Sequence, residues 1–396
     1  MSLNVALVTA TPPGFNPGML FSQVVARSFL ERHGLSRKTI FYRLVSMNQR
    51  LSHLEPSEQF ACLARIDDGI TYHLIESTDQ LKDAIPFYWG DLLHMHQYLN
   101  SIRDLIRNGN MTPENLLLLK DAPDEVLSRA VSFGTTFLFH DAFDIIDNPF
   151  GAAFQRFIRG AKRVLPRDMV SSSQIAAMLP QAPMSLGLDA TQLVCRMENW
   201  RDVFPEGTDT SIAVADVGLC YFARGNHTVE NLKNAIALLS FNFAMPVRWL
   251  PWGDRLSFPH LGDYEGKLGL ETLAGVMKPR LSALLEAVAK AAFVVTDTYH
   301  LAVIAWSLGT PALTLRGRHW EGDFNAVVDK RYIFHVQHGL QDFFHDEGPA
   351  DKHQLYQIVR RFADYDRIDK ALAWYKKIVS ARAQWCEQQL IQALKD

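Results

Sequence analysis

A stretch in the second half of the chain, residues 291–315, constrains the fold more than any other. It reads AAFVVTDTYHLAVIAWSLGTPALTL. The buried-type residues Phe293 to Val295 predict a strand, and Thr296 to Thr298 predict a polar hinge. The apolar run that follows predicts a helix that stops at Gly309, before a second strand. This strand–helix–strand order is typical of a parallel α/β sheet.

One histidine, His300, falls in the first turn of this predicted helix, directly after the strand. Ligands of open α/β sheets bind at the carboxyl ends of the strands. Helix amino ends attract anions through their N–H groups and the helix dipole. His300 is therefore a candidate catalytic acid, base or ligand contact, and a phosphate or carboxylate is the expected ligand. The alternative is that Thr296 or Asp297 caps the helix and His300 packs in its first turn.

Strand and helix signals alternate along both halves of the chain. In the first half, Asn4 to Thr9 and Ala84 to Trp89 predict strands, and Leu20 to Arg32 predicts a helix between them. In the second half, Ser211 to Phe222 predicts another strand, ahead of the stretch described above. Such alternation favours a parallel sheet with helices on both faces in each half.

A chain of 396 residues is too long for one typical core, so about two domains are expected. The polar stretch Phe204 to Thr210 is the best candidate linker. We therefore predict an α/β protein with two doubly wound Rossmann-like domains that face a cleft, residues 1–205 on the acceptor side and 206–396 on the donor side. A last helix, Ile368 to Leu394, is expected to pack at their junction.

Composition and charge exclude several classes of protein. The net charge of -3 offers no general attraction for nucleic acid. No segment approaches the roughly 20 apolar residues of a membrane span, and the apolar run at the amino terminus is too short for a signal peptide. The cysteines show no zinc-ligand spacing, so we expect reduced thiols in a cytoplasmic protein, with no metal and no cofactor. They are Cys62, Cys195, Cys220 and Cys386.

The segment Gly317 to His345 is rich in histidine. It contains His319, His335, His338 and His345. Their spacing matches no metal site, so loop and surface positions are expected for them.

Several pieces of the chain, taken in order, resemble the polysaccharide pyruvyl transferases. Residues 296–311 (TDTYHLAVIAWSLGTP) resemble the family's strand, histidine element, small-residue helix and Gly-x-Pro. Weaker pieces resemble its loop and strand-end elements from about residue 4 to 316. They are 15–20 (FNPGML), 88–95 (YWGDLLHM), 161–177 (AKRVLPRDMVSSSQIAA), 187–190 (GLDA) and 221–225 (YFARG).

The resemblance implies a GT-B-like fold and transfer of a pyruvyl group from phosphoenolpyruvate to sugar hydroxyls as a ketal, in exopolysaccharide biosynthesis. The acceptor would be a glycan or a lipid-linked saccharide, with peripheral membrane association possible. By match to the family, His300 would be the catalytic acid or base. Donor-binding residues would be Arg224, Thr298, Tyr299 and Arg316. Residues of the acceptor side or cleft would be Asn16, Gly18, Asp91, Arg167 and Asp168.

The chain also departs from the family. Thr298 stands where many relatives have an arginine, which removes one expected anion contact. Arg167 and Asp168 can equally form a structural ion pair, and Asp91 can simply cap its helix. Three interpretations therefore stay open. They are a pyruvyl transferase, a glycosyltransferase of the same architecture with a nucleotide-sugar donor, and a catalytically silent relative that binds or assembles.

Overall fold

The computed structural model describes residues 4–11, 16–45, 72–75, 77–90, 118–137, 149–212, 217–223, 229–253, 268–273, 280–316, 329–346, 356–357, 359–360 and 364–395. Within these ranges the strands form two separate six-stranded sheets, one in each half of the chain. Both sheets are parallel throughout the described pairings.

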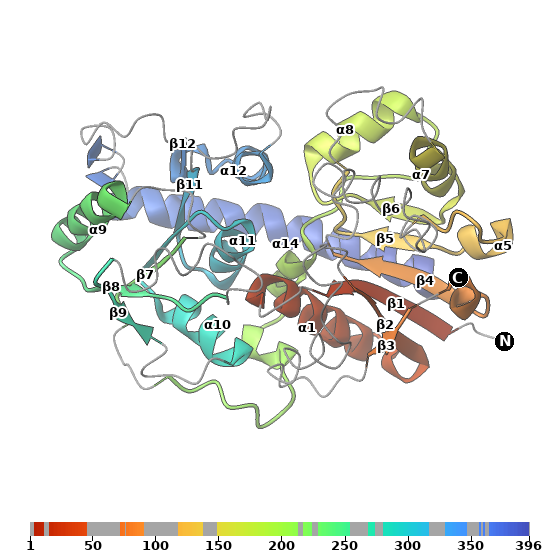
Figure 1. Cartoon of the computed structure of the whole chain (residues 1–396), viewed down its shortest axis with the longest axis horizontal. Coiled ribbons are helices and arrows are strands. Elements are labelled where there is room, and N and C mark those ends of the chain that lie inside the picture. The colour runs from red at the N-terminus through yellow and green to blue at the C-terminus, as the bar shows by residue number, and fades with distance from the viewer. Residues whose placement is uncertain are drawn as a thin grey trace.

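The first sheet has the order β3-β2-β1-β4-β5-β6. Its central strand β1 pairs on both sides, with Leu7 opposite Phe41 of β2 and Phe87 of β4. Both faces of β1 are buried, which explains its continuous apolar sequence. Helix α1 covers one face, and α5, α7 and α8 cover the other (Figure 1). The bounds are β1 (Asn4–Thr11), β2 (Thr39–Val45), β3 (His73–Leu74), β4 (Ala84–Trp89), β5 (Val131–Phe133), β6 (Arg163–Leu165), α1 (Pro17–Arg32), α5 (Asp124–Leu127), α7 (Pro149–Gly160) and α8 (Met169–Met178).

The second sheet has the order β12-β11-β10-β7-β8-β9. The strand–helix–strand stretch of residues 291–315 forms β10, α11 and β11, and Gly309 ends α11 with a left-handed φ of 88°. The bounds are β7 (Leu219–Phe222), β8 (Val247–Trp249), β9 (Glu271–Thr272), β10 (Phe293–Thr296), β11 (Ala312–Arg316), β12 (Phe344–Asp346), α9 (Val229–Phe243), α10 (Leu281–Lys290), α11 (Tyr299–Leu308) and α12 (Lys330–His338).

The two sheets have the same topology. In each, the first strand lies between the second and the fourth, so the chain reverses its direction across the sheet between β1 and β4, and again between β7 and β10. These positions are the topological switch points, where open α/β sheets bind ligands beyond the carboxyl ends of the strands. The predicted fold class, two doubly wound Rossmann-like α/β units, is confirmed.

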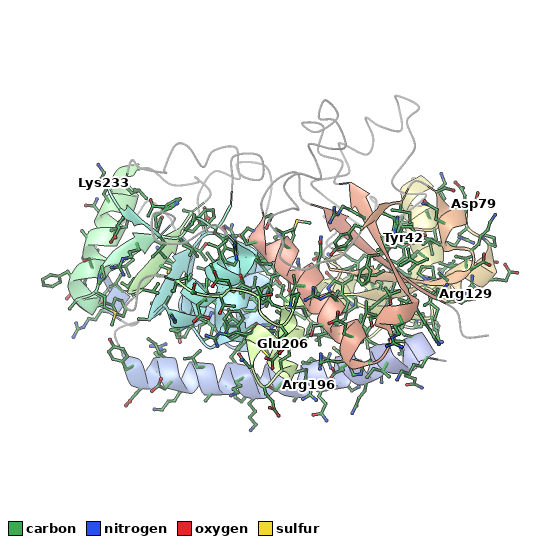
Figure 2. The ribbon with its side chains drawn as sticks, turned by 90° about the horizontal axis from the view of Figure 1, so that it is seen from below. Tyr42, Asp79, Arg129, Arg196, Glu206 and Lys233 are labelled. Carbon is green, nitrogen blue, oxygen red and sulfur yellow. The ribbon has the colours of Figure 1, made fainter. Side chains whose placement is uncertain are left out.

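The two halves are joined by a shared apolar core. Helix α1 of the first half packs against α10 and α11 of the second, and one cluster of buried side chains runs through both halves. The last helix, α14 (Tyr365–Lys395), runs along both halves, with Arg196 beside it (Figure 2). The exact domain limits, 1–205 and 206–396, stay a prediction.

The expectation of surface positions for the histidine-rich segment is wrong for the histidines that the structure describes. His335 and His338 lie on α12 and are buried, and His345 lies in β12 with 8% of its surface exposed. The two helical histidines are tolerated because each Nδ1–H donates to a carbonyl one turn back, Arg331 O at 2.7 Å and Phe334 O at 2.8 Å. His319 lies outside the described residues.

Two further features of the chain are the length of its apolar helices and the state of its cysteines. No helix in the described ranges is long and apolar enough to cross a membrane. Cys195, Cys220 and Cys386 are free thiols, and Cys220 and Cys386 are buried. Cys62 lies outside the described residues.

A buried carboxylate fastens α14 to the first half. Glu387 accepts from Arg196 Nε at 3.0 Å and lies 2.9 Å from His33 Nε2 and 3.0 Å from Arg32 Nη1. Burial raises the pKa of the Glu387 carboxyl, but the hydrogen bonds from His33 and Arg196 and the charge of Arg32 outweigh it and hold the pKa below its ordinary value. This stabilisation is therefore present above pH 4.5 and is lost as the pH falls below it.

Replacing Glu387 with glutamine is expected to lower the free energy of unfolding at pH 7 by about 2–3 kcal/mol, because charged hydrogen bonds are lost in a buried place. Urea unfolding followed by circular dichroism measures the change. Asp79→Asn is the control, since its ion pair with Lys82 is exposed to solvent and should contribute little to stability. Equal effects of the two substitutions would contradict the assigned role of Glu387.

Candidate active site at the two switch points

His300 lies where the two halves meet. It follows β10 in the first turn of α11, at the switch point of the second sheet. Gly18, in the first turn of α1, packs directly against it from the switch point of the first sheet. A Cβ built at Gly18 would lie 2.8 Å from His300 Cγ and closer still to His300 Cβ. The sequence therefore needs glycine at position 18 to let the two halves approach.

The loop sequence around Gly18 sets this contact. Asn16 caps α1, with its side chain accepting from Met19 N at 3.4 Å, and Pro17 takes the first helical position. Asn16 and Gly18 were both predicted to lie at the cleft. In the structure Asn16 caps α1, and Gly18 contacts His300.

Gly18→Ala is expected to lower the free energy of unfolding by about 1–3 kcal/mol, because the added methyl overlaps the stiff Cβ of His300. At an ordinary helix position, replacing glycine with alanine stabilises by up to about 1 kcal/mol. A measured loss of stability would therefore indicate the overlap with His300, and a gain would indicate an ordinary helix position. The double variant that also carries His300→Gly lacks the overlapping Cβ and should recover part of the loss. A stabilised Gly18→Ala single variant would contradict the described contact.

A buried carboxylate, Asp189, faces His300 from the first half. Its Oδ2 lies 4.0 Å from His300 Nε2 and 3.7 Å from Arg167 Nη1. Its Oδ1 accepts from Thr191 N at 3.0 Å and from Thr191 Oγ1 at 2.6 Å. One oxygen is thus held by the backbone and a hydroxyl, which directs the other toward His300 and Arg167. Such an arrangement suits a histidine that exchanges a proton.

Two cationic side chains lie near the amino end of α11. The Arg167 guanidinium lies over the Tyr299 ring, 4.4 Å from its centre, and Lys330 Nζ lies 5.3 Å from it. Arg167 follows β6 of the first sheet, whereas Lys330 begins α12 of the second half. The first N–H groups of α11 have no carbonyl partner within the helix, so this end of α11 combines a helix dipole with nearby positive charge. The arrangement suits an anion.

A small cavity of about 20 Å³ opens beside His300. It is lined by the ends of β1 and β4, by the first turns of α1, by Asp189 and by His300 itself. This volume holds about one water molecule. The cavity marks the place where the two switch points meet around the histidine.

The other predicted site residues divide into three groups. Asp168 caps α8, accepting from Ser171 N at 2.8 Å, so its observed role is structural. Thr298 is the residue before α11, makes no side-chain cap and donates to Asp297 Oδ1 at 3.3 Å. Arg224 and Asp91 lie outside the described residues, and Arg316 is described only through its backbone in β11.

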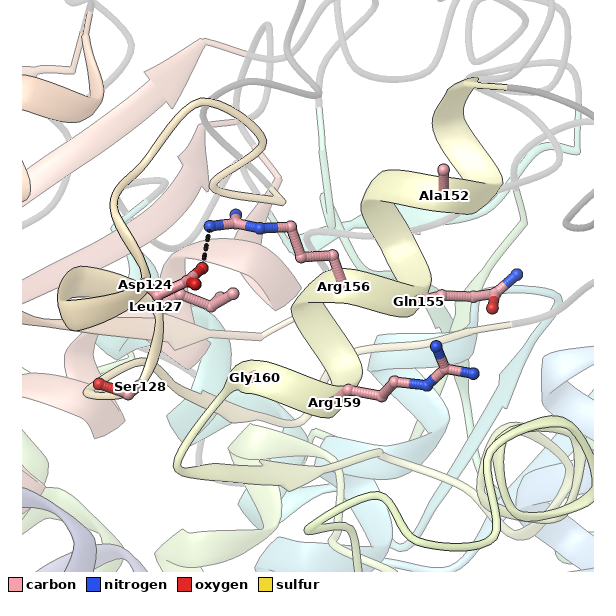
Figure 3. Close-up of a pocket in the computed structure, with 8 residues that line it drawn as sticks. All are labelled: Asp124, Leu127, Ser128, Ala152, Gln155, Arg156, Arg159 and Gly160. Atoms are coloured by element: carbon pink, nitrogen blue, oxygen red, sulfur yellow. Dashed lines mark hydrogen bonds and ion pairs between the residues drawn. The ribbon is translucent and has the colours of Figure 1, made fainter.

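A larger hollow, about 600 Å³, lies on the outer side of the first half between α5 and α7. Arg156 reaches across it to Asp124, at 2.6 Å, while Arg159 points away from that pair (Figure 3). Arg156 also donates to the carbonyls of Leu119 and Ala122. These bonds tie a loop to α7, and the hollow is remote from both switch points, so we do not regard it as the reaction site.

Sequence reasoning missed the partners of His300. Asp189 belongs to the GLDA element, and Asp189 and Gln192 have the spacing of a capping box, which the structure shows. Lys330 carried no local signal, because α12 reaches the site through the tertiary fold. Within the described ranges, no group of three or more His, Cys, Asp or Glu side chains is placed to hold a metal ion.

No protein-family model matches the chain, and no curated protein sequence matches it. Several solved structures resemble it in fold. The UDP-GlcNAc 2-epimerase from Neisseria meningitidis bound to UDP-GlcNAc matches with a TM-score of 0.52 and 11% identity, over 99% of this chain and 99% of that one. Phytolacca americana UGT2, complexed with UDP-2fluoro-glucose and pterostilbene, matches with a TM-score of 0.51 and 10% identity, over 99% and 100%. The S. aureus MnaA–UDP co-structure matches with a TM-score of 0.51 and 11% identity, over 99% and 95%.

These likenesses contradict the expected transfer of pyruvate from phosphoenolpyruvate. The matched structures are of an epimerase, a glycosyltransferase and a UDP-bound protein, all of the same two-sheet architecture. Where the structure describes them, the loop elements that suggested a pyruvyl transferase lie at strand ends and helix starts, which form the ligand-binding edge of doubly wound sheets in general. The resemblance to that family stays a prediction. What the structures show is that the chain has the GT-B fold.

Proposed function

We propose that the chain is an enzyme that acts on a nucleoside-diphosphate sugar, with UDP as the nucleotide portion. The observation that carries this function is the amino end of α11 at the switch point of the second sheet, with Arg167 and Lys330 beside it. A diphosphate is the anion that best matches a helix amino end flanked by cations. The neighbours of the same fold that hold UDP or UDP sugars support the choice of nucleotide.

His300 is the residue that would transfer a proton in the reaction. It lies in the same helical turn that would hold the diphosphate, so the sugar carbon attached to the phosphate falls within its reach. Asp189, 4.0 Å away, would stabilise the charged imidazole. The reaction class is breakage or formation of the bond between the sugar and the diphosphate. A hydroxyl of a glycan or other acceptor would enter from the first half.

Binding would require movement. Pockets for ligands of this size enclose about 300–1,000 Å³, whereas the cavity beside His300 has about 20 Å³. The contact between Gly18 and His300 would therefore open as the sugar enters. Hinge motions of this kind commonly accompany ligand binding between domains.

The first experiment is thermal unfolding with UDP, with phosphoenolpyruvate as the comparison ligand. A ligand that binds only the folded chain raises the melting temperature, so UDP should raise it and phosphoenolpyruvate should not. Lys330→Met should weaken UDP binding roughly tenfold, because one charge-assisted contact is worth somewhat more than 1 kcal/mol. Lys233→Met, on the exposed surface of α9 (Figure 2), is the matched control and should leave binding unchanged. Stabilisation by both ligands alike would contradict a nucleotide site.

A further inference from the structure

The side chain of Gln192 makes a hydrogen-bond network in which one consistent set of donors and acceptors can be assigned. Its Oε1 accepts from Asp189 N at 3.0 Å, so its Nε2 carries both amide protons. These point to His338 Nε2 at 3.1 Å and Tyr375 Oη at 2.9 Å. His338 must therefore accept at Nε2, which agrees with its Nδ1–H donating to Phe334 O at 2.8 Å.

The network continues to a third helix. Because Tyr375 Oη accepts from Gln192, its hydroxyl proton is available to Ser307 Oγ at 3.0 Å. Ser307 Oγ donates in turn to Val303 O at 2.7 Å, within α11. Gln192 belongs to the short helix η5 (Ala190–Arg196), and its side-chain partners His338 and Tyr375 lie on α12 and α14. The amide thus connects the segment after the first sheet to α12 and α14 directly, and to α11 through Tyr375.

The network is buried, which makes its geometry strict. Gln192 is 1% exposed, His338 2% and Tyr375 1%. A buried polar group that loses its partner costs about 1–3 kcal/mol, so small displacements of Gln192 are opposed from several sides. Satisfied networks of this kind fix one arrangement of a core.

We propose that Gln192 is the positioning residue that fixes Asp189 opposite His300. Gln192 holds the backbone N–H of Asp189, and Thr191 holds its Oδ1, so the free direction of Oδ2 is set toward His300 and Arg167. Gln192 itself is not among the residues that line the cavity beside His300. This role deepens the proposed function, because it concerns the acid–base pair of that site.

The test reads His300 directly in the ligand-free protein. The ring signals of isotope-labelled histidine are followed by NMR against pH, with His300→Gln to assign them. Asp189 is the carboxylate near the imidazole, and Arg167 and Lys330 are the cations that share its surroundings. In Gln192→Met the carboxylate loses its fixed place, so the titration midpoint of His300 should fall by roughly 0.5–1 pH unit.

Ser307→Ala is the matched control, since it removes the far end of the network and keeps the bond from Asp189 N to Gln192. It should leave the midpoint of His300 unchanged. If both variants lose stability and neither moves the midpoint, Gln192 is only structural and the positioning role is wrong. Should Gln192→Met fail to fold, Gln192→Asn decides in its place, because its shorter side chain keeps an amide but does not reach Asp189 N; a fall in the midpoint then supports the role, and an unchanged midpoint overturns it.

This result is independent of ligand identity. If UDP does not bind but Gln192→Met shifts the His300 titration, the proposed nucleotide is wrong and the positioning role stands. If UDP binds and the titration does not shift, the reverse holds.

Discussion

His300→Gln is expected to slow turnover of a UDP sugar by about 10²- to 10⁴-fold, the usual contribution of a positioned acid or base. Glutamine keeps a polar side chain of similar length but cannot exchange a proton near neutral pH. Because the diphosphate would be held by the amino end of α11 and by the cations beside it, the affinity for UDP should change only a few-fold. The loss should therefore appear mainly in kcat.

The measurement is steady-state release of UDP from a set of UDP sugars, with calorimetry for UDP affinity. His73→Gln, at an exposed position in β3, is the matched control. Retention of full turnover by His300→Gln would show that His300 only packs in its helix. Binding of UDP without turnover in the wild-type chain would instead favour a catalytically silent relative.

Acidification from pH 6.5 to about 4 is expected to lower the free energy of unfolding by roughly 3 kcal/mol for each of two buried histidines. Burial lowers the pKa of His335 and of His338 from 6.5 to about 4. Between pH 6.5 and about 4 the two histidines are protonated in the unfolded chain and neutral in the folded chain, so the free energy of unfolding falls as the pH falls. Above pH 6.5 both states hold neutral imidazoles, and this contribution to stability is fully present.

The structure gives the reason for the resistance to protonation. A proton on His338 Nε2 would point at the Gln192 amide protons, and His335 lies among the rings of Phe334 and Phe344. His335→Phe should remove about half of the pH dependence between pH 6.5 and 4. His73→Gln should leave it intact. A flat stability profile across this range would contradict the buried, neutral state of the two histidines.

The central elements of the fold could be predicted from sequence because their signals are local. The strand over Ala84–Trp89 has the bounds that its apolar pattern predicts, and the helix predicted to stop at Gly309 ends at Leu308. β2 and β12 were missed, since an edge or near-edge strand with mixed polarity lacks a continuous apolar run. The strand expected over Ser211–Phe222 is confined to its end, Leu219–Phe222, in the described residues.

The site was only partly predictable for a different reason. His300 was found because it follows a strand, which is a local fact. Asp189 faces it from the other half, and Lys330 reaches the same end of α11 from α12, and no spacing in the chain encodes those contacts. The prediction of phosphoenolpyruvate as the donor is wrong because loop residues at strand ends indicate the fold. The ligand is selected by side chains that the fold brings together from distant segments.

The central claim is that a nucleoside diphosphate binds at the amino end of α11, and a crystal structure with UDP tests it most directly. We predict that the phosphate oxygens lie about 3 Å from N–H groups in the first turn of α11, with Arg167 and Lys330 turned toward them. Gly18 and His300 should be farther apart than in the ligand-free chain. UDP bound elsewhere, or no bound UDP at saturating concentration, would contradict the claim.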